Sequence, residues 1–224
     1  MTDEGTRSRR ERPAKPALTR AGIVAAAVRL MRAEGLARVT MRRLAQELDT
    51  GPASLYVYVR NTAELHAAVL DELLGELTPP RAGRWDERLV GLLTDYTTLL
   101  FAQPSLARAA LSTWPRGPHY LRLVESVLAL LTEGGVPGPQ AAWGVDVLLQ
   151  FGTATAAEQS DRDGSAEAGT EWDALTDVLR GASADTYPQL AAWGPALLTG
   201  TPEGRLRRGF RVLIHGIADT PLPE

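Results

Sequence analysis

Apolar residues recur along this chain at the three- and four-residue spacing that places them on one face of a helix. The first such segment starts after Thr19, a good N-cap residue, and ends at Gly35. Its apolar face holds Ile23, Ala27, Leu30 and Met31. No alternating apolar and polar run bounded by turns persists, so the pattern predicts an all-α fold.

A pair of short helices is predicted next. Thr40 is placed to cap the first of them, and the turn residues Asp49-Thr50-Gly51 should end it. Pro52 suits the first turn of the second, where its missing N–H costs nothing. The run Asn61-Thr62-Ala63-Glu64 has the form of a capping box and predicts a further helix that reaches Leu77.

The rest of the chain continues in the same helical pattern. It predicts helices over residues 86–101, 104–113, 119–134, 139–159, 171–181 and 187–193, and a last one that opens at Thr201. Residues 160–170 are polar and should form a loop, and the arginine-rich residues 1–17 a disordered basic arm. We therefore expect a three-helix head over residues 18–64, followed by a larger helical body over residues 65–224.

Composition narrows the possible chemistry. With 44% hydrophobic and 23% charged residues, the 224-residue chain can bury an ordinary core. It has no cysteine, which excludes disulfides, cysteine-based zinc sites and thiol catalysis. No apolar run approaches the roughly 20 residues that span a bilayer, and no signal peptide follows Met1. These features predict a cytoplasmic protein with no membrane partner.

The sequence shows no constellation typical of an enzyme. His66, His119 and His215 lack the spacing of metal ligands and are expected in the core or in solvent. There are no paired carboxylates, no nucleophile with its base and no phosphate-binding glycine loop. We therefore predict no metal, no cofactor and no catalytic residue.

The charge is unevenly distributed. Residues 1–62 hold twelve Lys and Arg and six Asp and Glu, a net charge of +6, whereas the remaining residues carry −9. A basic head on an acidic body is typical of a segment that binds a polyanion. The alternative is that the N-terminal arginines only keep a flexible tail in solution.

The predicted short pair, with a third helix beneath it, has the arrangement of a helix-turn-helix motif, whose second helix lies in the major groove of DNA. The outward face of that second helix would be uncharged and comprises Gly51, Ala53, Ser54, Tyr56 and Tyr58. Small residues allow close approach to bases, and phenol hydroxyls reach phosphates. Two short helices around a glycine turn also occur in proteins that bind no DNA.

Two stretches make the interpretation specific. These are Thr40-Met41-Arg42-Arg43-Leu44-Ala45-Gln46-Glu47-Leu48 and Ser54-Leu55-Tyr56-Val57-Tyr58-Val59-Arg60-Asn61. Together with the preceding helix, Ile23 to Gly35, they resemble the DNA-binding head of the tetracycline-repressor (TetR) family over residues 19–75. The Tyr187-Pro188-Gln189-Leu190 segment and the last helix are similar to the C-terminal domain of the family's tetracycline-repressor branch.

The resemblance implies which residues contact DNA. Thr40 and Arg42 would contact phosphate or a base edge. Pro52, Ala53 and Ser54 would face the bases. Tyr56 would bond the DNA backbone, and Tyr58 would lie at the end of the reading helix.

Two positions depart from the family pattern. The family usually has Lys where this chain has Thr62, and Arg60 or the basic arm would have to replace that positive contact. It also favours Gly where this chain has Asp49, but aspartate tolerates left-handed backbone geometry, so we expect the turn to survive.

Reading a palindrome in double-stranded DNA requires two heads related by a two-fold axis. By resemblance, the long helix over residues 139–159 and the last helix would form a four-helix bundle with their mates in a homodimer. The residues expected at this interface are Val145, Leu148, Leu149, Phe210, Leu213 and Ile217. Alternatively, both helices belong to the core of one chain, since a large apolar face fits either role.

A sensing body needs an apolar pocket with a few convergent polar groups. The expected lining is Phe101, Trp114, His119, Tyr120, Trp143, Gln150, Phe151 and Thr153. Each aromatic residue taken singly is more often a core residue. The tetracycline-repressor branch binds its drug with a magnesium ion through histidine and acidic ligands, a set that has no counterpart here, so tetracycline is not the expected effector.

Together these patterns predict a ligand-responsive DNA-binding transcriptional regulator. We expect a homodimeric repressor that binds a palindromic operator and is released by an unidentified small apolar or aromatic effector. The alternatives are a protein-interaction adaptor built on the helical body, or an all-α enzyme.

Overall fold

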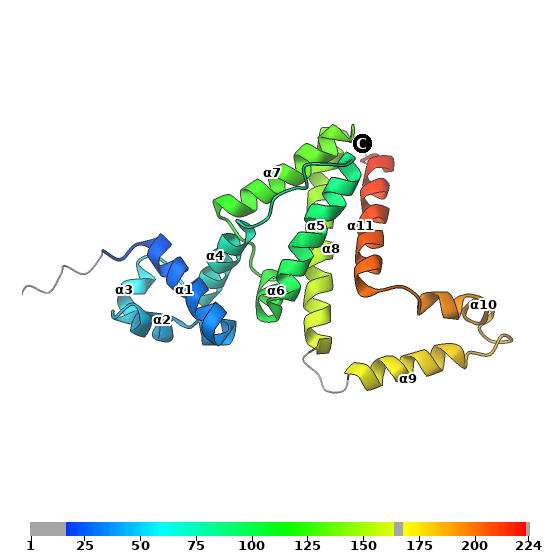
Figure 1. The fold of residues 1–224 in the computed structure, drawn as a ribbon, viewed down its shortest axis with the longest axis horizontal. Helices are drawn as coiled ribbons and strands as arrows, with labels where there is room; N and C mark the ends of the chain where they lie inside the picture. Colours follow the sequence, from blue (N-terminus) through cyan, green and yellow to red (C-terminus); the bar gives the residue numbers. More distant parts are fainter. Residues whose placement is uncertain (1–16, 164–167, 223–224) are drawn as a thin grey trace, which may run out of the picture.

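The computed structural model describes residues 17–163 and 168–222, and every regular element within these ranges is a helix (Figure 1). In chain order the elements are α1 (Arg20–Glu34), the 3-10 helix η1 (Leu36–Arg38), α2 (Met41–Glu47), α3 (Pro52–Tyr56), α4 (Thr62–Leu74), α5 (Trp85–Phe101), α6 (Pro104–Ala110), α7 (Pro118–Glu133), α8 (Gly138–Asp163), α9 (Ala168–Arg180), α10 (Pro188–Leu197) and α11 (Pro202–Asp219). The all-α prediction is confirmed. The predicted arm over residues 1–17 lies, except for its last residue, outside the described ranges.

The helix starts in the head follow the predicted caps. Thr19 Oγ1 accepts the backbone N–H of Gly22 at 3.0 Å, and Thr40 Oγ1 accepts that of Arg43 at 3.2 Å. Each hydroxyl satisfies an N–H group that the first turn of a helix leaves without a partner. The starts of α1 and α2 are therefore set by local chemistry that the sequence displays.

Helix α4 leads from the head into the body and is shorter than predicted. Asn61 Oδ1 accepts the N–H of Glu64 at 2.8 Å, while the Glu64 carboxylate accepts the N–H of Arg60 at 2.9 Å, so the capping box closes one residue earlier than usual. The helix ends at Leu74 and does not reach Leu77. Beyond Leu74 the N–H groups of residues 75–77 donate three residues back, to the carbonyls of residues 72–74, so the last turn tightens and the α-helix ends.

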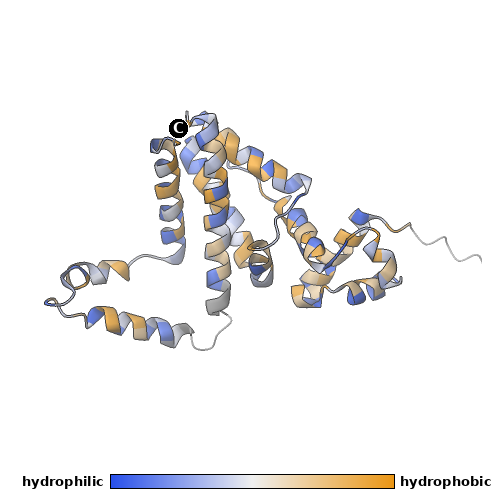
Figure 2. Ribbon diagram, turned by 180° about the vertical axis from the view of Figure 1, so that it is seen from behind, coloured by the Kyte–Doolittle hydropathy of each residue, from blue (hydrophilic) through white to orange (hydrophobic). Residues whose placement is uncertain are grey.

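The body is built around α8, which packs against α5, α6, α7 and α11. Figure 2 shows apolar and polar residues alternating along these helices, as amphipathic helices that share a core require. Side chains that are completely buried in this core include Leu89, Leu93, Leu100, Leu131, Leu148 and Phe210. This buried core is continuous with that of α1 to α4, because α4 packs against both α6 and α7.

The predicted loop over residues 160–170 is largely helical, because α8 continues to Asp163 and α9 starts at Ala168. Residues 160–163 contain no glycine or proline that would end α8. Helices α9 and α10 pack against each other and extend away from the body as an arm (Figures 1 and 2). Exposed apolar side chains on this arm are Trp172, Leu175, Val178, Tyr187, Trp193 and Leu197.

Candidate nucleic-acid interface and ligand cavity

Helices α2 and α3 form the pair that the sequence predicted; α2 packs against both α1 and α3. Leu44, Leu55 and Val59 are completely buried in the core of the head. Asp49 turns the chain between the two helices with φ +48°, in the left-handed region. Aspartate tolerates this geometry, so the turn forms here without the glycine that the family favours at this position.

The side chains on the outer face of α3 point away from the head core. Pro52, Ala53 and Ser54 are all exposed, and Tyr56 is 51% exposed. Tyr58 is also exposed and lies just past the end of the helix, where its N–H donates to Leu55 O at 2.9 Å. The structure therefore brings the predicted reading residues together on one uncharged surface.

Val57 also belongs to this surface, and the sequence reasoning missed it. Its side chain is 80% exposed. It follows Ala53 by four residues and Ser54 by three, the spacing that places residues on one side of a helix. The spacing alone could have identified it.

Thr40 and Arg42 stand at the start of α2. Thr40 Oγ1 accepts the N–H of Arg43, so its own hydroxyl hydrogen remains to be donated. The Arg42 side chain is exposed. The geometry thus leaves one hydroxyl donor and one guanidinium next to each other at the helix start, which suits contact with phosphate oxygens.

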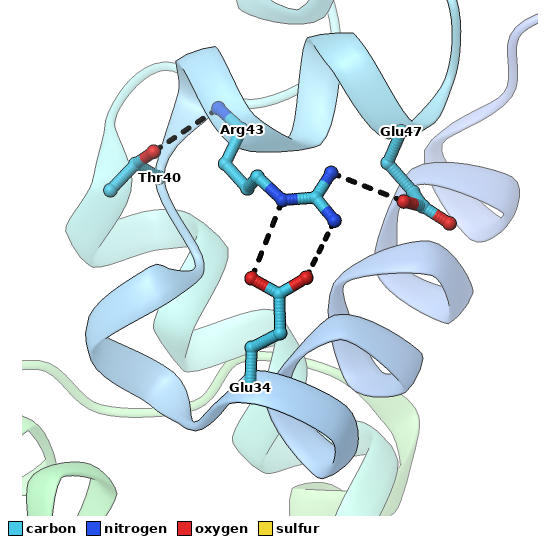
Figure 3. A network of polar contacts seen from close by, with 4 residues as sticks. All are labelled: Glu34, Thr40, Arg43 and Glu47. Atoms are coloured by element: carbon cyan, nitrogen blue, oxygen red, sulfur yellow. Dashed lines mark hydrogen bonds and ion pairs between the residues drawn. The ribbon is translucent and has the colours of Figure 1, made fainter.

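Arg43, the neighbour of Arg42, has a structural role (Figure 3). Its guanidinium donates to both Glu34 carboxylate oxygens, at 2.6 and 3.4 Å, and to Glu47 at 3.2 Å. The hydrogen bond from Arg43 lowers the pKa of Glu34, and the same bond raises the pKa of Arg43. These contacts join α1 to α2, so of the two adjacent arginines only Arg42 is left for an external anion.

Arg60, predicted to replace the missing lysine contact, is engaged by Glu64. Its Nε donates to Glu64 Oε2 at 3.1 Å, and Arg20 approaches the other oxygen at 3.9 Å. The hydrogen bond from the Arg60 backbone N–H, together with its side chain, lowers the pKa of Glu64. Part of the Arg60 charge is therefore neutralised within the head.

A cavity of about 200 Å³ lies in the body among α5, the end of α6, α7 and α8. Four of the predicted pocket residues line it, namely Trp114, Tyr120, Gln150 and Thr153. Lining residues that the pocket prediction missed are Tyr96, Ala110, Leu111, Pro115, Asp146 and Leu149, the last of which was expected at the dimer interface. Asp146 precedes Gln150 by four residues on α8, so the helical spacing could have indicated it.

The polar groups of this cavity include two phenols. Tyr96 Oη lies 2.6 Å from Thr153 Oγ1, and burial raises the pKa of Tyr96 to about 12. Burial, together with the nearby Asp146 carboxylate, also raises the pKa of Tyr120. Both phenols therefore stay protonated at neutral pH and offer hydroxyl groups to a ligand.

The other four predicted pocket residues lie elsewhere. Phe101 is half-buried against the body core, and Trp143 is 65% exposed on the outer face of α8. Phe151 packs edge-on against Phe210, with ring centroids 5.1 Å apart. His119 lines a different hollow. Aromatic character alone did not distinguish these positions, because aromatic residues fill cores as readily as pockets.

That second hollow is a cleft of about 910 Å³ between the head and the body. Its walls are α1, α4 and the segment 112–119, and its charged lining includes Arg20, Glu64, Asp71, Glu72 and Arg116. Trp114 and Pro115 line both hollows. The α6–α7 segment is thus a thin wall between the cavity of the body and the cleft behind the head.

The predicted dimer residues need correction. Val145, Leu148, Leu149 and Phe210 are buried in the core of this single chain, and Leu213 and Ile217 are partly buried against it. Ile217 fits closely beside Gly144 of α8. Leu148 and Phe210 are completely buried and Val145 and Leu149 nearly so, which leaves these four almost no surface for a partner.

Within residues 17–163 and 168–222, no three His, Asp or Glu side chains are placed to hold a metal ion together. Over the same part of the chain, no helix combines the length and apolar character that crossing a membrane requires.

Comparison with known proteins agrees with this arrangement. The family model described as bacterial regulatory proteins, tetR family, matches residues 23–69, which span α1 to α4. The model described as the tetracyclin repressor-like C-terminal domain matches residues 78–220.

Individual relatives resemble nearly the whole chain. An HTH-type transcriptional regulator from Saccharopolyspora erythraea is 30% identical over 92% of this chain and 87% of its own. A solved Streptomyces coelicolor structure, described as a candidate transcription regulator, is 58% identical with a TM-score of 0.79, covering 94% of this chain and 99% of its own. The structure of the Streptomyces coelicolor TetR family protein ActR in complex with actinorhodin is 37% identical with a TM-score of 0.76, covering 90% and 96%. The chain therefore belongs to the TetR family and is a ligand-responsive, DNA-binding transcriptional regulator.

Proposed function

We propose that this chain is a homodimeric repressor that binds a palindromic operator through α2 and α3 and leaves it when a small aromatic effector enters the cavity of the body. The observation that carries the proposal is the exposed, uncharged face of α3 beside the start of α2. A regulator that blocks a promoter acts where the bacterial DNA lies, so we infer that it works in the cytoplasm.

The exposed face matches the tasks of a reading helix. Ser54 can donate to or accept from a base edge, and the Ala53 methyl group and the Val57 side chain suit contact with a thymine methyl group. Tyr56 and the Thr40 hydroxyl can donate to phosphate oxygens. Base contacts and backbone contacts are thus supplied by different residues of one surface.

The proposal is tested with DNA from upstream of the chain's own gene and of its neighbours, titrated at two salt concentrations against scrambled DNA of the same length. We expect specific binding that weakens as salt rises, because phosphate contacts release counterions. Equal affinity for the scrambled DNA, or no binding at either salt concentration, would refute the proposal that the chain binds a specific operator in this DNA.

Arg42→Ala should lower operator affinity about fivefold to tenfold and reduce the salt slope by about 1, since one phosphate contact is lost. The Arg81→Ala variant is the matched control, because Arg81 is also exposed but lies in the loop before α5. Fluorescence anisotropy at several salt concentrations measures both effects. An unchanged slope for Arg42→Ala would remove Arg42 from the interface.

We propose that the dimer forms through the outer faces of α8 and α11. Trp143 and Val147 lie one turn apart on α8, and Val212 of α11 is 61% exposed. Gly216, one turn after Val212, has open space around it and allows another helix to approach closely. Since α8 and α11 pack side by side, these residues give the single chain an apolar surface that a second copy would cover.

The arm of α9 and α10 supports the same arrangement. Its exposed Trp172, Leu175 and Val178 are spaced by three residues along α9, so they share one face of that helix. This face of α9 lies on the arm that extends away from the body, so the core of the body does not cover it in the described chain. We infer that this face packs against the second copy.

Val212→Asp should raise the dissociation constant of the dimer at least tenfold, because a carboxylate would be buried without a partner. Leu121→Asp is the control, as Leu121 is equally exposed but lies on α7. Sedimentation equilibrium distinguishes them. A dimer that is unaffected by Val212→Asp would place the interface elsewhere.

The cavity indicates the class of effector. Tyr96, Tyr120 and Trp114 supply flat apolar surface, while the Gln150 amide can supply hydrogen bonds. The Thr153 hydroxyl already donates to Leu149 O. At about 200 Å³ the cavity is smaller than most ligand pockets, which hold about 300 Å³ or more. The 66% exposed Trp114 side chain forms part of its wall and is free to move outward for a larger ring system. The ActR structure, which is a complex with actinorhodin, supports a small-molecule effector for this chain as well.

A further inference from the structure

A buried carboxylate joins the head to the body. Asp71 lies in the last turn of α4 and is only 7% exposed. Its Oδ1 accepts the backbone N–H of Tyr120, in the first turn of α7, at 2.9 Å. A buried carboxylate is costly unless it is hydrogen-bonded, so its placement at this point requires a compensating interaction.

The start of α7 provides that interaction. Its N-cap is Gly117, which has no side chain to accept the N–H groups of the first turn, and Pro118 follows at the first helical position. Asp71 therefore caps α7 from another helix, where its negative charge also meets the positive end of the helix dipole.

Gly117 is required here for space. Its φ of −93° is open to any residue, but a Cβ at this position would overlap the Asp71 carboxylate. The same close packing continues at the end of α4, where a Cβ at Gly75 would overlap the His119 ring. Glu72 also lies 4.0 Å from His119 Nε2. The end of α4 and the first turn of α7 thus fit together as one joint.

This joint has the ligand cavity on one side and the head on the other. The side chain of Tyr120, the residue whose N–H binds Asp71, lines the cavity. Toward the start of α4, Leu65 is completely buried, and His66 Nε2 lies 3.4 Å from Val39 O, just before α2. A displacement of α7 at Tyr120 therefore reaches the DNA-binding pair through a single helix.

We propose that Asp71 is the positioning residue that couples the effector cavity to the DNA-binding head, by holding the first turn of α7 to α4. This inference rests on the proposed function of the cavity. Coupling between two sites is reciprocal, so DNA bound to the head must also change the first turn of α7. That reciprocity allows a test without the effector.

The test is hydrogen–deuterium exchange of the full chain, free and with the upstream DNA that the wild type binds. In the wild type, DNA should change exchange in residues 118–123. Asp71→Ala should raise exchange there at least tenfold in the free protein and remove its response to DNA. Asp71→Asn keeps an oxygen that accepts the Tyr120 N–H, so it should restore both protection and response.

Gly117→Ala gives a second route, because it displaces the carboxylate while leaving Asp71 in place. We expect it to reproduce the Asp71→Ala result. Gly138→Ala is the matched control, since Gly138 also stands at a helix start but has nothing within 4 Å of its Cβ position. If Asp71→Ala fails to fold, the Gly117→Ala and Gly138→Ala pair decides the question.

An α7 response to DNA that persists in Asp71→Ala or in Gly117→Ala would overturn the proposal. So would exchange at Tyr120 that is unchanged in the free variants. The free-protein measurement does not depend on operator binding, and direct titration of the DNA reports on the proposed function separately. Failure of the coupling and failure of the operator assignment therefore give different results.

Discussion

Ala53→Glu should weaken operator binding at least about 100-fold, which corresponds to about 2.7 kcal/mol. Ala53 is exposed in the first turn of α3, on the surface formed with Ser54 and Val57. A carboxylate there would face DNA in the proposed complex and would lose its hydration close to the phosphates. The folded head should tolerate it, because acidic residues are favourable in the first turn of a helix.

The measurement is operator titration by fluorescence anisotropy, with thermal unfolding of the same samples. Ala82→Glu adds the same charge at an exposed position in the loop before α5 and serves as the control. It should change affinity less than threefold. An Ala53→Glu variant that binds the operator like the wild type would show that α3 does not face the bases.

Phe210→Ala should lower the free energy of unfolding by about 3–5 kcal/mol, the usual cost of removing a fully buried phenylalanine. Phe210 is completely buried and packs edge-on against Phe151, which ties α11 to α8. The family resemblance placed Phe210 at a dimer interface, with the core of one chain as the alternative. Because Phe210 is buried within one chain, we expect the loss in free energy of unfolding to come from the core of the body and not from a dimer interface.

Urea denaturation measures this change, with Leu121→Ala as the control. Leu121 is an exposed apolar residue on α7, and its truncation should change the free energy by less than about 0.5 kcal/mol. A loss of less than 1 kcal/mol for Phe210→Ala would contradict its placement in the core. A loss that vanished on raising the protein concentration would instead return Phe210 to the interface.

The helices of the head were predictable because their starts depend on neighbouring residues. Thr19, Thr40 and Asn61 each cap a helix through a bond that spans three residues. Asp49 adopts the left-handed geometry expected of it. The exposed reading surface followed from the spacing of Ala53, Ser54 and Tyr56, since burial of Leu55 and Val59 fixes the opposite side of the segment.

The different roles of adjacent residues required the tertiary structure. Arg42 and Arg43 are indistinguishable as sequence, yet Glu34 of α1 binds Arg43 and leaves Arg42 exposed. Only four of the eight predicted pocket residues meet in the cavity, because an aromatic residue packs equally well in a core or a pocket. Asp71 gave no sequence signal, as its partner is a backbone N–H 49 residues away.

Helix α8 shows the limit most clearly. Val145, Leu148 and Leu149 form one apolar side, and Trp143 and Val147 form another. The periodicity of apolar residues therefore predicted a buried helix, but it did not indicate which side of α8 faces the core of its own chain. Local patterns were enough to predict most of the helices, the caps of the head helices and the uncharged exposed face of α3, because these features depend on contacts within a few residues. Which apolar side of α8 is buried depends on the distant helices that pack against it, so it could be read only from the folded chain.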